Sequence, residues 1–165
     1  MGTIPGAALI VSVDNGISSH GVGGNQLLML AGGLGYVFNI LTSTLTQITD
    51  AAFPAGAKQA AFLDGYFIVT AGNMAFSVSE LYNGLVYPPL ATAAAIAAPD
   101  NIQKPFGSNQ VLYLVKDSTT EVWQDAAIPT SQGCPFAHIP GSLVNFGTLA
   151  DRSVARVGDM VFMLG

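Results

Sequence analysis

The chain has 165 residues, a formal net charge of −5 and a pI near 4.5. Charged residues form 9% of it, against roughly 25% in an average soluble domain, and 50% is apolar. Five Lys and Arg residues are too few and too widely spaced for direct DNA wrapping, and no apolar run approaches the ~18 residues of a membrane span. The closest basic pair, Arg152 and Arg156, is expected to be a solvated surface pair. We expect one soluble domain whose apolar excess is covered by partners or further chain; a Gly- and Ala-rich β protein that needs few charges is the alternative.

In chain order, the first third predicts short strands, turns and one long loop. The loop at 16–25 is rich in Gly, Ser and Asn, and 51–56 is expected to connect two units. Gly32, Gly33 and Gly35 lead into a strand, so they predict a turn and not the phosphate cradle that a following helix would make. The expected strands are 8–13, 26–30, 36–40 and 45–48.

A hairpin outline recurs along the rest of the chain. Its clearest copy comprises a turn at 108–109, a strand at 111–115, a turn at 116–118 and a strand at 119–123. Less regular copies begin at Gly32 and at Asp64, the latter with strands at 66–69 and 74–78, and another begins at Gly158 and runs into 161–164. Sheet units that recur every few tens of residues are typical of a β-propeller.

The connections between these copies carry most of the prolines. The pair Asn83 and Gly84 predicts a tight turn before a third strand at 85–87. Residues 88–106 and 125–146 are expected to be crossovers between units. Only 92–98 has a helical composition, and it lacks the length and polar face of a stable helix.

These elements predict an all-β fold, a β-propeller-like array of antiparallel blades in a single domain over residues 1–165. We expect about three to four blade units, with an N-terminal strand and Gly-rich loop over residues 1–31. The last strand has no successor, whereas a propeller protects its edges by closing a ring of typically four to eight blades. The array is therefore expected to be incomplete, as the front portion of a longer propeller; a neighbouring copy that supplies the missing strands is the alternative.

The sequence predicts no catalytic, cofactor-binding or metal-binding residue, and no cofactor. Cys134 is the only cysteine and is expected to be a small packed residue. His20 and His138 lie far apart and show no metal-ligand spacing, and His138 is expected to be a surface or packed histidine. No Gly-x-Ser-x-Gly nucleophile motif is present.

Four carboxylates and one tryptophan remain as candidates for a sugar site, because propellers can host glycosidases. Asp64 fits a hairpin turn, Asp100 a loop after proline, and Glu121 an outward or hydrogen-bonded strand position. Glu80 precedes a turn. Trp123 could stack on a sugar or anchor a partner if exposed, but we expect it to pack between blades.

Several short motifs stand in one order along the chain. They are FLDGYFI at 62–68, SELYNG at 79–84, PDN at 99–101, TTEVW at 119–123, PF at 135–136, IPG at 139–141, SVA at 153–155 and VFMLG at 161–165. Together they resemble the packaged-DNA stabilisation proteins of short-tailed bacteriophages, tail accessory factors or tail hubs, over about residues 62–165. The first sixty or so residues match in general character only, and the chain is shorter than a typical member.

The resemblance implies a non-enzymatic structural protein of the virion tail, assembled in the host cytoplasm. Members of that family are taken to form a hexameric ring below the portal and its adaptor. They extend and close the tail channel, retain packaged DNA and dock the tail needle and tailspikes. The implied partners are therefore further copies of the chain, the portal-adaptor complex, the needle and the tailspikes, with an indirect relation to DNA and none to a membrane.

Two other classes of protein remain as alternatives. A carbohydrate-binding propeller would need exposed aromatic side chains at its blade rims. A propeller glycoside hydrolase would need carboxylates that converge in a central pit.

Overall fold

The computed structural model describes residues 3–4, 9–16, 24–157 and 160–164, and this part of the chain is all-β without a helix. Three four-stranded antiparallel sheets and one two-stranded sheet follow one another along the chain. The all-β prediction is confirmed. Over the same residues, no helix of the length and apolarity needed to span a membrane is found.

In the first sheet, four strands pair in chain order as a meander. A tight turn joins the second and third strands at Gly32 and Gly33, whose φ angles of 59° and 81° lie in the left-handed region. Glycine adopts this region without steric cost, so the predicted turn is confirmed. The strands are β1 (Ile10–Asp14), β2 (Gln26–Ala31), β3 (Leu34–Asn39) and β4 (Thr44–Gln47).

The second sheet repeats the meander, with strands β5 (Gln59–Leu63), β6 (Tyr66–Thr70), β7 (Ala75–Val78) and β8 (Thr92–Ala94). Its first hairpin turns at Asp64 and Gly65, both with positive φ, as expected for an Asp-Gly pair. The hairpin predicted at Asp64 is confirmed.

The third sheet contains the clearest hairpin of the sequence, β10 to β11, and its strands pair in the order β12-β11-β10-β9. A separate hairpin of two short strands follows near the end of the chain. The strands are β9 (Ile102–Ser108), β10 (Val111–Lys116), β11 (Thr120–Asp125), β12 (Phe136–His138), β13 (Ala155–Val157) and β14 (Met160–Phe162).

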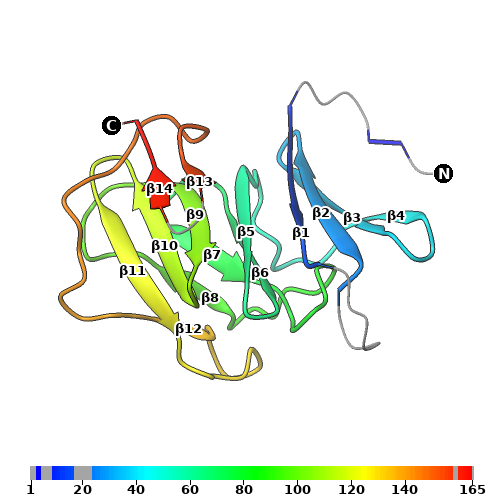
Figure 1. Ribbon diagram of the computed structural model, residues 1–165. Helices are drawn as coiled ribbons and strands as arrows, with labels where there is room; N and C mark the ends of the chain where they lie inside the picture. Colours follow the sequence, from blue (N-terminus) through cyan, green and yellow to red (C-terminus); the bar gives the residue numbers. More distant parts are fainter. Residues whose placement is uncertain (1–2, 5–8, 17–23, 158–159, 165) are drawn as a thin grey trace.

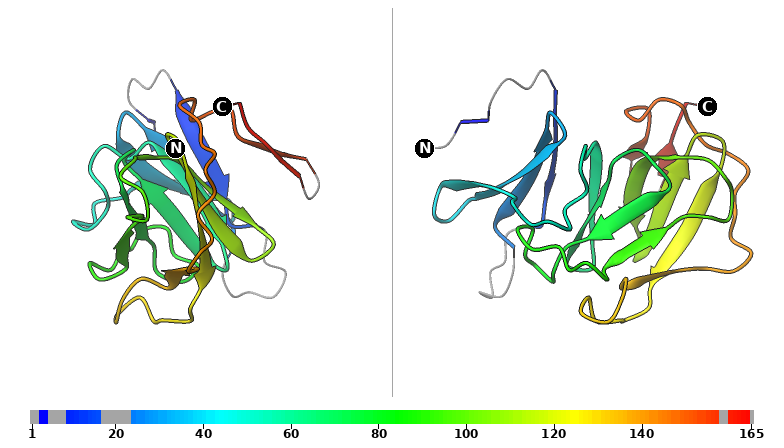
Figure 2. Two further views of the ribbon diagram at one scale, coloured as in Figure 1. Left: turned by 90° about the vertical axis from the view of Figure 1, so that its left-hand side faces the viewer. Right: turned by 180° about the vertical axis from the view of Figure 1, so that it is seen from behind.

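The three sheets stand side by side in chain order, with the first strand of each sheet innermost (Figures 1 and 2). β5 contacts both β1 and β9. β9 pairs with β10 alone, so it is an edge strand, and this explains why it tolerates Pro105. Beside β9, the Lys104 ammonium donates to the Val154 carbonyl over 3.2 Å, which places the start of the β13–β14 hairpin next to the third sheet.

Two apolar cores lie between the sheets. The core between the first and second sheets includes Leu28, Val37 and Phe67, and Tyr87 fills it from the β7–β8 connection with its ring 5.0 Å from that of Phe53. The core between the second and third sheets consists of Ile68, Phe76, Val78, Ala91, Ala95, Ile102, Leu112, Leu114, Trp123 and Phe136. Each sheet is therefore held by apolar contact between its face and that of its neighbour, as in propeller blades.

Trp123 packs in the second core as expected. Its side chain is 7% exposed, and its ring meets that of Phe76 edge-on at a centroid distance of 5.2 Å.

Three sequence predictions about the connections are wrong. Residues 85–87 form no strand, and the fourth strand of the second sheet is β8; the turn predicted at Asn83 and Gly84 is present, but it lies within the β7–β8 loop. Residues 88–106 are not one crossover, because β8 and most of β9 lie inside them, and 125–146 contains β12. β8 and β12 are three residues long, and β9 contains Pro105 and Gly107, so these strands carry little of the β signal that the predictions relied on.

The remaining expected elements agree with the structure where it describes them. β2, β3, β4, β6, β7, β10, β11 and β14 match the predicted strands to within a few residues. The first strand is observed at Ile10–Asp14, and part of its predicted range lies outside the described residues, as do most of the Gly-rich loop, His20 and the turn at Gly158 and Asp159.

A glycine substitution tests how closely the long connection after β12 packs on the third sheet. A Cβ on Gly147 would collide with the Lys116 carbonyl oxygen and lie 2.7 Å from the backbone of Ser118. Since backbone cannot move aside as a side-chain tip can, we expect Gly147→Ala to lower the free energy of unfolding by about 1–3 kcal/mol, measured by urea denaturation.

Gly133→Ala is the matched control. A Cβ there meets only Ile128 Cγ2 at 3.4 Å, an ordinary contact, and the backbone is not left-handed. We expect unchanged or slightly higher stability. Equal stability of the two variants would contradict the close packing at Gly147.

Candidate functional site

The two ends of the strands differ in charge. Because each sheet is a meander, the loops β1–β2, β5–β6 and β9–β10 leave from the same end as the loops β3–β4, β7–β8 and β11–β12. The acids at this end, which we call the acidic end, are Asp14, Asp64, Glu80 and Asp125, and no Lys or Arg accompanies them among the described residues. The opposite end of the strands, which we call the mixed end, carries both acidic and basic residues. The negative net charge is therefore concentrated at the acidic end.

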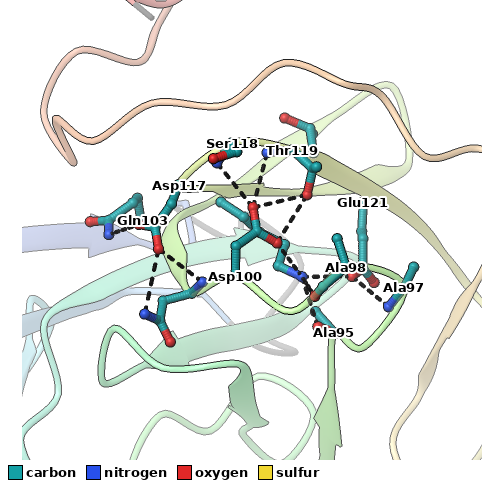
Figure 3. A network of polar contacts seen from close by, with 12 residues as sticks. Ala95, Ala97, Ala98, Asp100, Gln103, Asp117, Ser118, Thr119 and Glu121 are labelled. Carbon is teal, nitrogen blue, oxygen red and sulfur yellow. Dashed lines mark hydrogen bonds and ion pairs between the residues drawn. The ribbon is translucent and has the colours of Figure 1, made fainter.

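At the mixed end, a cluster of charged side chains joins the β8–β9 connection, which follows the second sheet, to the third sheet (Figure 3). The Lys116 ammonium, at the end of β10, lies 2.9 Å from Glu121 Oε1 and 2.9 Å from Asp100 Oδ1. It also donates to the carbonyls of Ala95 and Ala98 in the β8–β9 connection. We call Asp100, Lys116 and Glu121 the polar clamp. The side chains of Lys116 and Glu121 are 0% and 1% exposed, so this charge pair is shielded from bulk solvent and depends on its protein partners.

Each carboxylate of the polar clamp also accepts hydrogen bonds from backbone amides of neighbouring loops. Glu121 accepts from the Ala97 amide at 3.0 Å and from the Trp123 indole at 3.2 Å, which fixes the tryptophan ring against the second sheet. Asp100 accepts from the amides of Ser118 and Thr119 in the β10–β11 turn, at 2.9 and 3.0 Å.

The surroundings of Asp100 set its protonation. Burial raises the pKa of this carboxyl, but hydrogen bonds from Lys116, Ser118 and Thr119 and the charge of Lys116 outweigh it and hold the pKa below the ordinary value of 3.8. The carboxylate of Asp117, in the same turn, accepts hydrogen bonds from the Asn101 backbone amide and from Gln103 Nε2. Every charged group of the polar clamp is thus occupied by structure, and the arrangement stabilises the fold and leaves no group free to bind a substrate.

At the acidic end, carboxylates line an open pocket of about 560 Å³ between the second and third sheets. Burial, and then the negative charge of Asp125, raise the pKa of Asp64 above its ordinary value. The lining residues are Asp64, Asn109, Gln110, Val111, Gln124, Asp125 and Ala127. Nearby, Thr130 donates to Glu80 over 2.8 Å and links the β11–β12 loop to the β7–β8 loop.

The four carboxylates considered from the sequence therefore separate into two places. Asp64 and Glu80 lie at the acidic end, where the pKa of Tyr66 is raised by burial and then by Asp125, Glu80 and Asp64. Asp100 and Glu121 belong to the polar clamp. Sequence reasoning missed Asp125 and Lys116; a lone lysine at the end of an apolar strand, five residues before a glutamate, is the one signal that could have indicated a buried pair.

The remaining candidates fit structural roles. Cys134 is partly buried, and burial raises its pKa to about 11, which disfavours a reactive thiolate at neutral pH. His138 packs beside Trp123 with ring centroids 5.8 Å apart. Arg152 is exposed, as expected of a surface residue, and the described residues contain no group of three or more potential metal ligands.

Consecutive four-stranded antiparallel meanders, packed face to face with their first strands innermost, define a β-propeller-like protein. The model of the family described as "Bacteriophage P22 Gp10, beta-propeller" matches residues 1–165, the whole chain. The chain belongs to this family of phage structural proteins, which stabilise packaged DNA. The match includes the first sixty-one residues, beyond the region that carried the resemblance in the sequence. A comparison with curated proteins gives no match.

Removing the ammonium of the polar clamp tests its importance for stability. In Lys116→Met, the buried Glu121 carboxylate and the partly buried Asp100 carboxylate lose their cation, so we expect a loss of about 3–5 kcal/mol in the free energy of unfolding, measured by urea denaturation. Lys58→Met, a change at an exposed lysine, is the control and should cost less than about 0.5 kcal/mol. Similar losses in the two variants would contradict a specific role of the buried charge.

The lowered pKa of Asp100 predicts an acid dependence. Its carboxylate stabilises the fold above the unfolded-state value of 3.8, and this contribution is lost as the pH falls through the lower folded-state pKa. We expect Asp100→Asn to be less stable than wild type at neutral pH, with the difference shrinking as the pH falls below 3.8, in urea titrations at several pH values. Asp64→Asn, at a carboxyl whose pKa is raised, should show the opposite sign. A pH-independent deficit in Asp100→Asn would contradict the assignment.

Proposed function

We propose that this protein is a tail-hub component that closes the tail channel below the portal and adaptor and thereby retains packaged DNA. The observation that carries the proposal is the open array of sheets in a member of a packaged-DNA stabilisation family. Each end of the array presents apolar side chains that no further four-stranded sheet covers among the described residues; only the two-stranded β13–β14 sheet lies near one of them. Such surfaces need large protein interfaces, which a plug in a channel supplies.

At one end of the array, the face of the first sheet that points away from the second lines an apolar hollow. It is lined by Thr3, Ile4, Leu27, Met29, Phe38, Ser43 and Leu45. At the other end, Phe106 and Tyr113 of the third sheet face Val161 and Met163 across an apolar hollow of about 180 Å³. We propose that further blades of the same propeller cover both faces, so that residues 1–165 form the front portion, of three to four blade units, in a single propeller-type domain.

Retention by blocking needs no basic groove. A closed ring stops DNA under pressure sterically, so an acidic chain with few lysines and arginines suits this role. The ring is proposed to contain six copies, to form on the portal-adaptor complex after synthesis in the host cytoplasm, and to dock the tail needle and tailspikes. The protein is proposed to act without catalysis and without a cofactor.

The closing test adds the purified full-length protein to DNA-filled heads that carry portal and adaptor but lack this protein. We expect a ring-sized mass on the heads and protection of the packaged DNA from added nuclease. A protein that stays monomeric in native mass measurements and leaves the DNA unprotected would contradict the proposal.

Two aspartate substitutions in the first sheet give a matched pair of variants. Leu27→Asp lies in the apolar hollow, whereas Thr46→Asp places the same charge on an exposed position of β4. Only Leu27→Asp should lower the stability of the full-length protein and the protection of DNA. Equal effects of the two variants would contradict coverage of this face by another blade.

A further inference from the structure

The acidic end combines one-signed charge with exposed apolar side chains in one patch. Leu81 and Tyr82 are 48% and 38% exposed, and they lie over the hairpin turn after Asp64, because the Tyr82 amide donates to the Gly65 carbonyl at 2.7 Å. Ile128, 38% exposed, follows Ala127 at the rim of the pocket.

Hydrogen bonds join the two loops that carry these residues into one surface. Thr130 of the β11–β12 loop donates to Glu80 of the β7–β8 loop over 2.8 Å. The Ala127 amide donates to Asp125 Oδ1 at 2.7 Å, which fixes the carboxylate at the mouth of the pocket. We call Asp64, Glu80 and Asp125 with Leu81, Tyr82 and Ile128 the acidic patch.

We propose that the acidic patch is a docking surface for a protein partner with a basic surface, whose Lys or Arg side chain enters the pocket between Asp64 and Asp125. The partner's apolar side chains cover Leu81, Tyr82 and Ile128. This inference concerns a second surface of the molecule and does not depend on the ring or on DNA retention.

The chemistry of the patch selects this kind of partner. Nucleic acid is repelled by three carboxylates without a nearby Lys or Arg among the described residues. Asp64 and Asp125 repel each other in the free protein, and a cation between them relieves that repulsion. A central apolar contact with a charged rim is also the usual composition of protein interfaces, in which tyrosine is enriched.

Asp64 permits a substitution that separates docking from folding. Its φ is 49°, in the left-handed region where asparagine is at least as well tolerated as aspartate, and its carboxylate accepts no hydrogen bond from the part of the chain that the structure describes. Asp125→Asn keeps the acceptor oxygen for the Ala127 amide. The double variant Asp64→Asn, Asp125→Asn is therefore expected to fold with wild-type stability or slightly better.

The probe is a fluorescent peptide of repeated Lys-Lys-Leu, titrated with the full-length protein and followed by fluorescence anisotropy. We expect the double variant to bind it roughly tenfold more weakly than wild type at low ionic strength. Asp14→Asn, Asp151→Asn makes the same change in net charge outside the acidic patch and should alter binding less than about twofold. Leu81→Ser, Ile128→Ser should weaken binding without any change in charge.

Three results would overturn the inference. Equal losses in the two charge variants would mean that the peptide responds to net charge alone. Unchanged binding in Leu81→Ser, Ile128→Ser would remove the apolar part of the docking surface. Equal binding of a Glu-Glu-Leu peptide would exclude a preference for basic partners.

Discussion

The burial of one lysine ammonium is the constraint on which the order of the sheets depends. Lys116 loses its hydration, so both carboxylates and the carbonyls of Ala95 and Ala98 must stand around it. These partners come from the β8–β9 connection, which joins the second sheet to the third, and from the β10–β11 hairpin of the third sheet. The buried charge therefore holds the β8–β9 connection against the third sheet. Glu121 also accepts a hydrogen bond from the Trp123 indole, and the Trp123 ring packs on Phe76 in the core between the second and third sheets.

The fold and the proposed role share one physical requirement, the coverage of apolar sheet faces. Inside the array, each face meets its neighbour, and at the two ends apolar hollows stand open. A low charge content is tolerable when most faces are covered in the assembled particle. The polar residues that remain are used in two ways: they stabilise loops at the mixed end, and they leave a one-signed surface at the acidic end.

The sequence predicted the hairpins because their signals are local. Gly32–Gly33 and the Asp64–Gly65 turn are recognisable from adjacent residues, and the strands beside them are rich in β-branched and aromatic residues. β8 and β12 were missed because each is only three residues long, and β9 because Pro105 and Gly107 interrupt it; β9 tolerates Pro105 only as an edge strand, which topology decides. The polar clamp was equally hidden, since Asp100 meets its partners from sixteen or more residues away and no spacing rule describes such a contact.

The most direct test of the account is an electron cryo-microscopy reconstruction of the protein in its virion. We expect density for the three sheets as consecutive blades of one propeller, with a sheet covering the outer face of β1–β4 and further strands continuing β13–β14 as the next blade. Density in which β13–β14 stays a lone hairpin, with both end faces exposed to solvent, would contradict it.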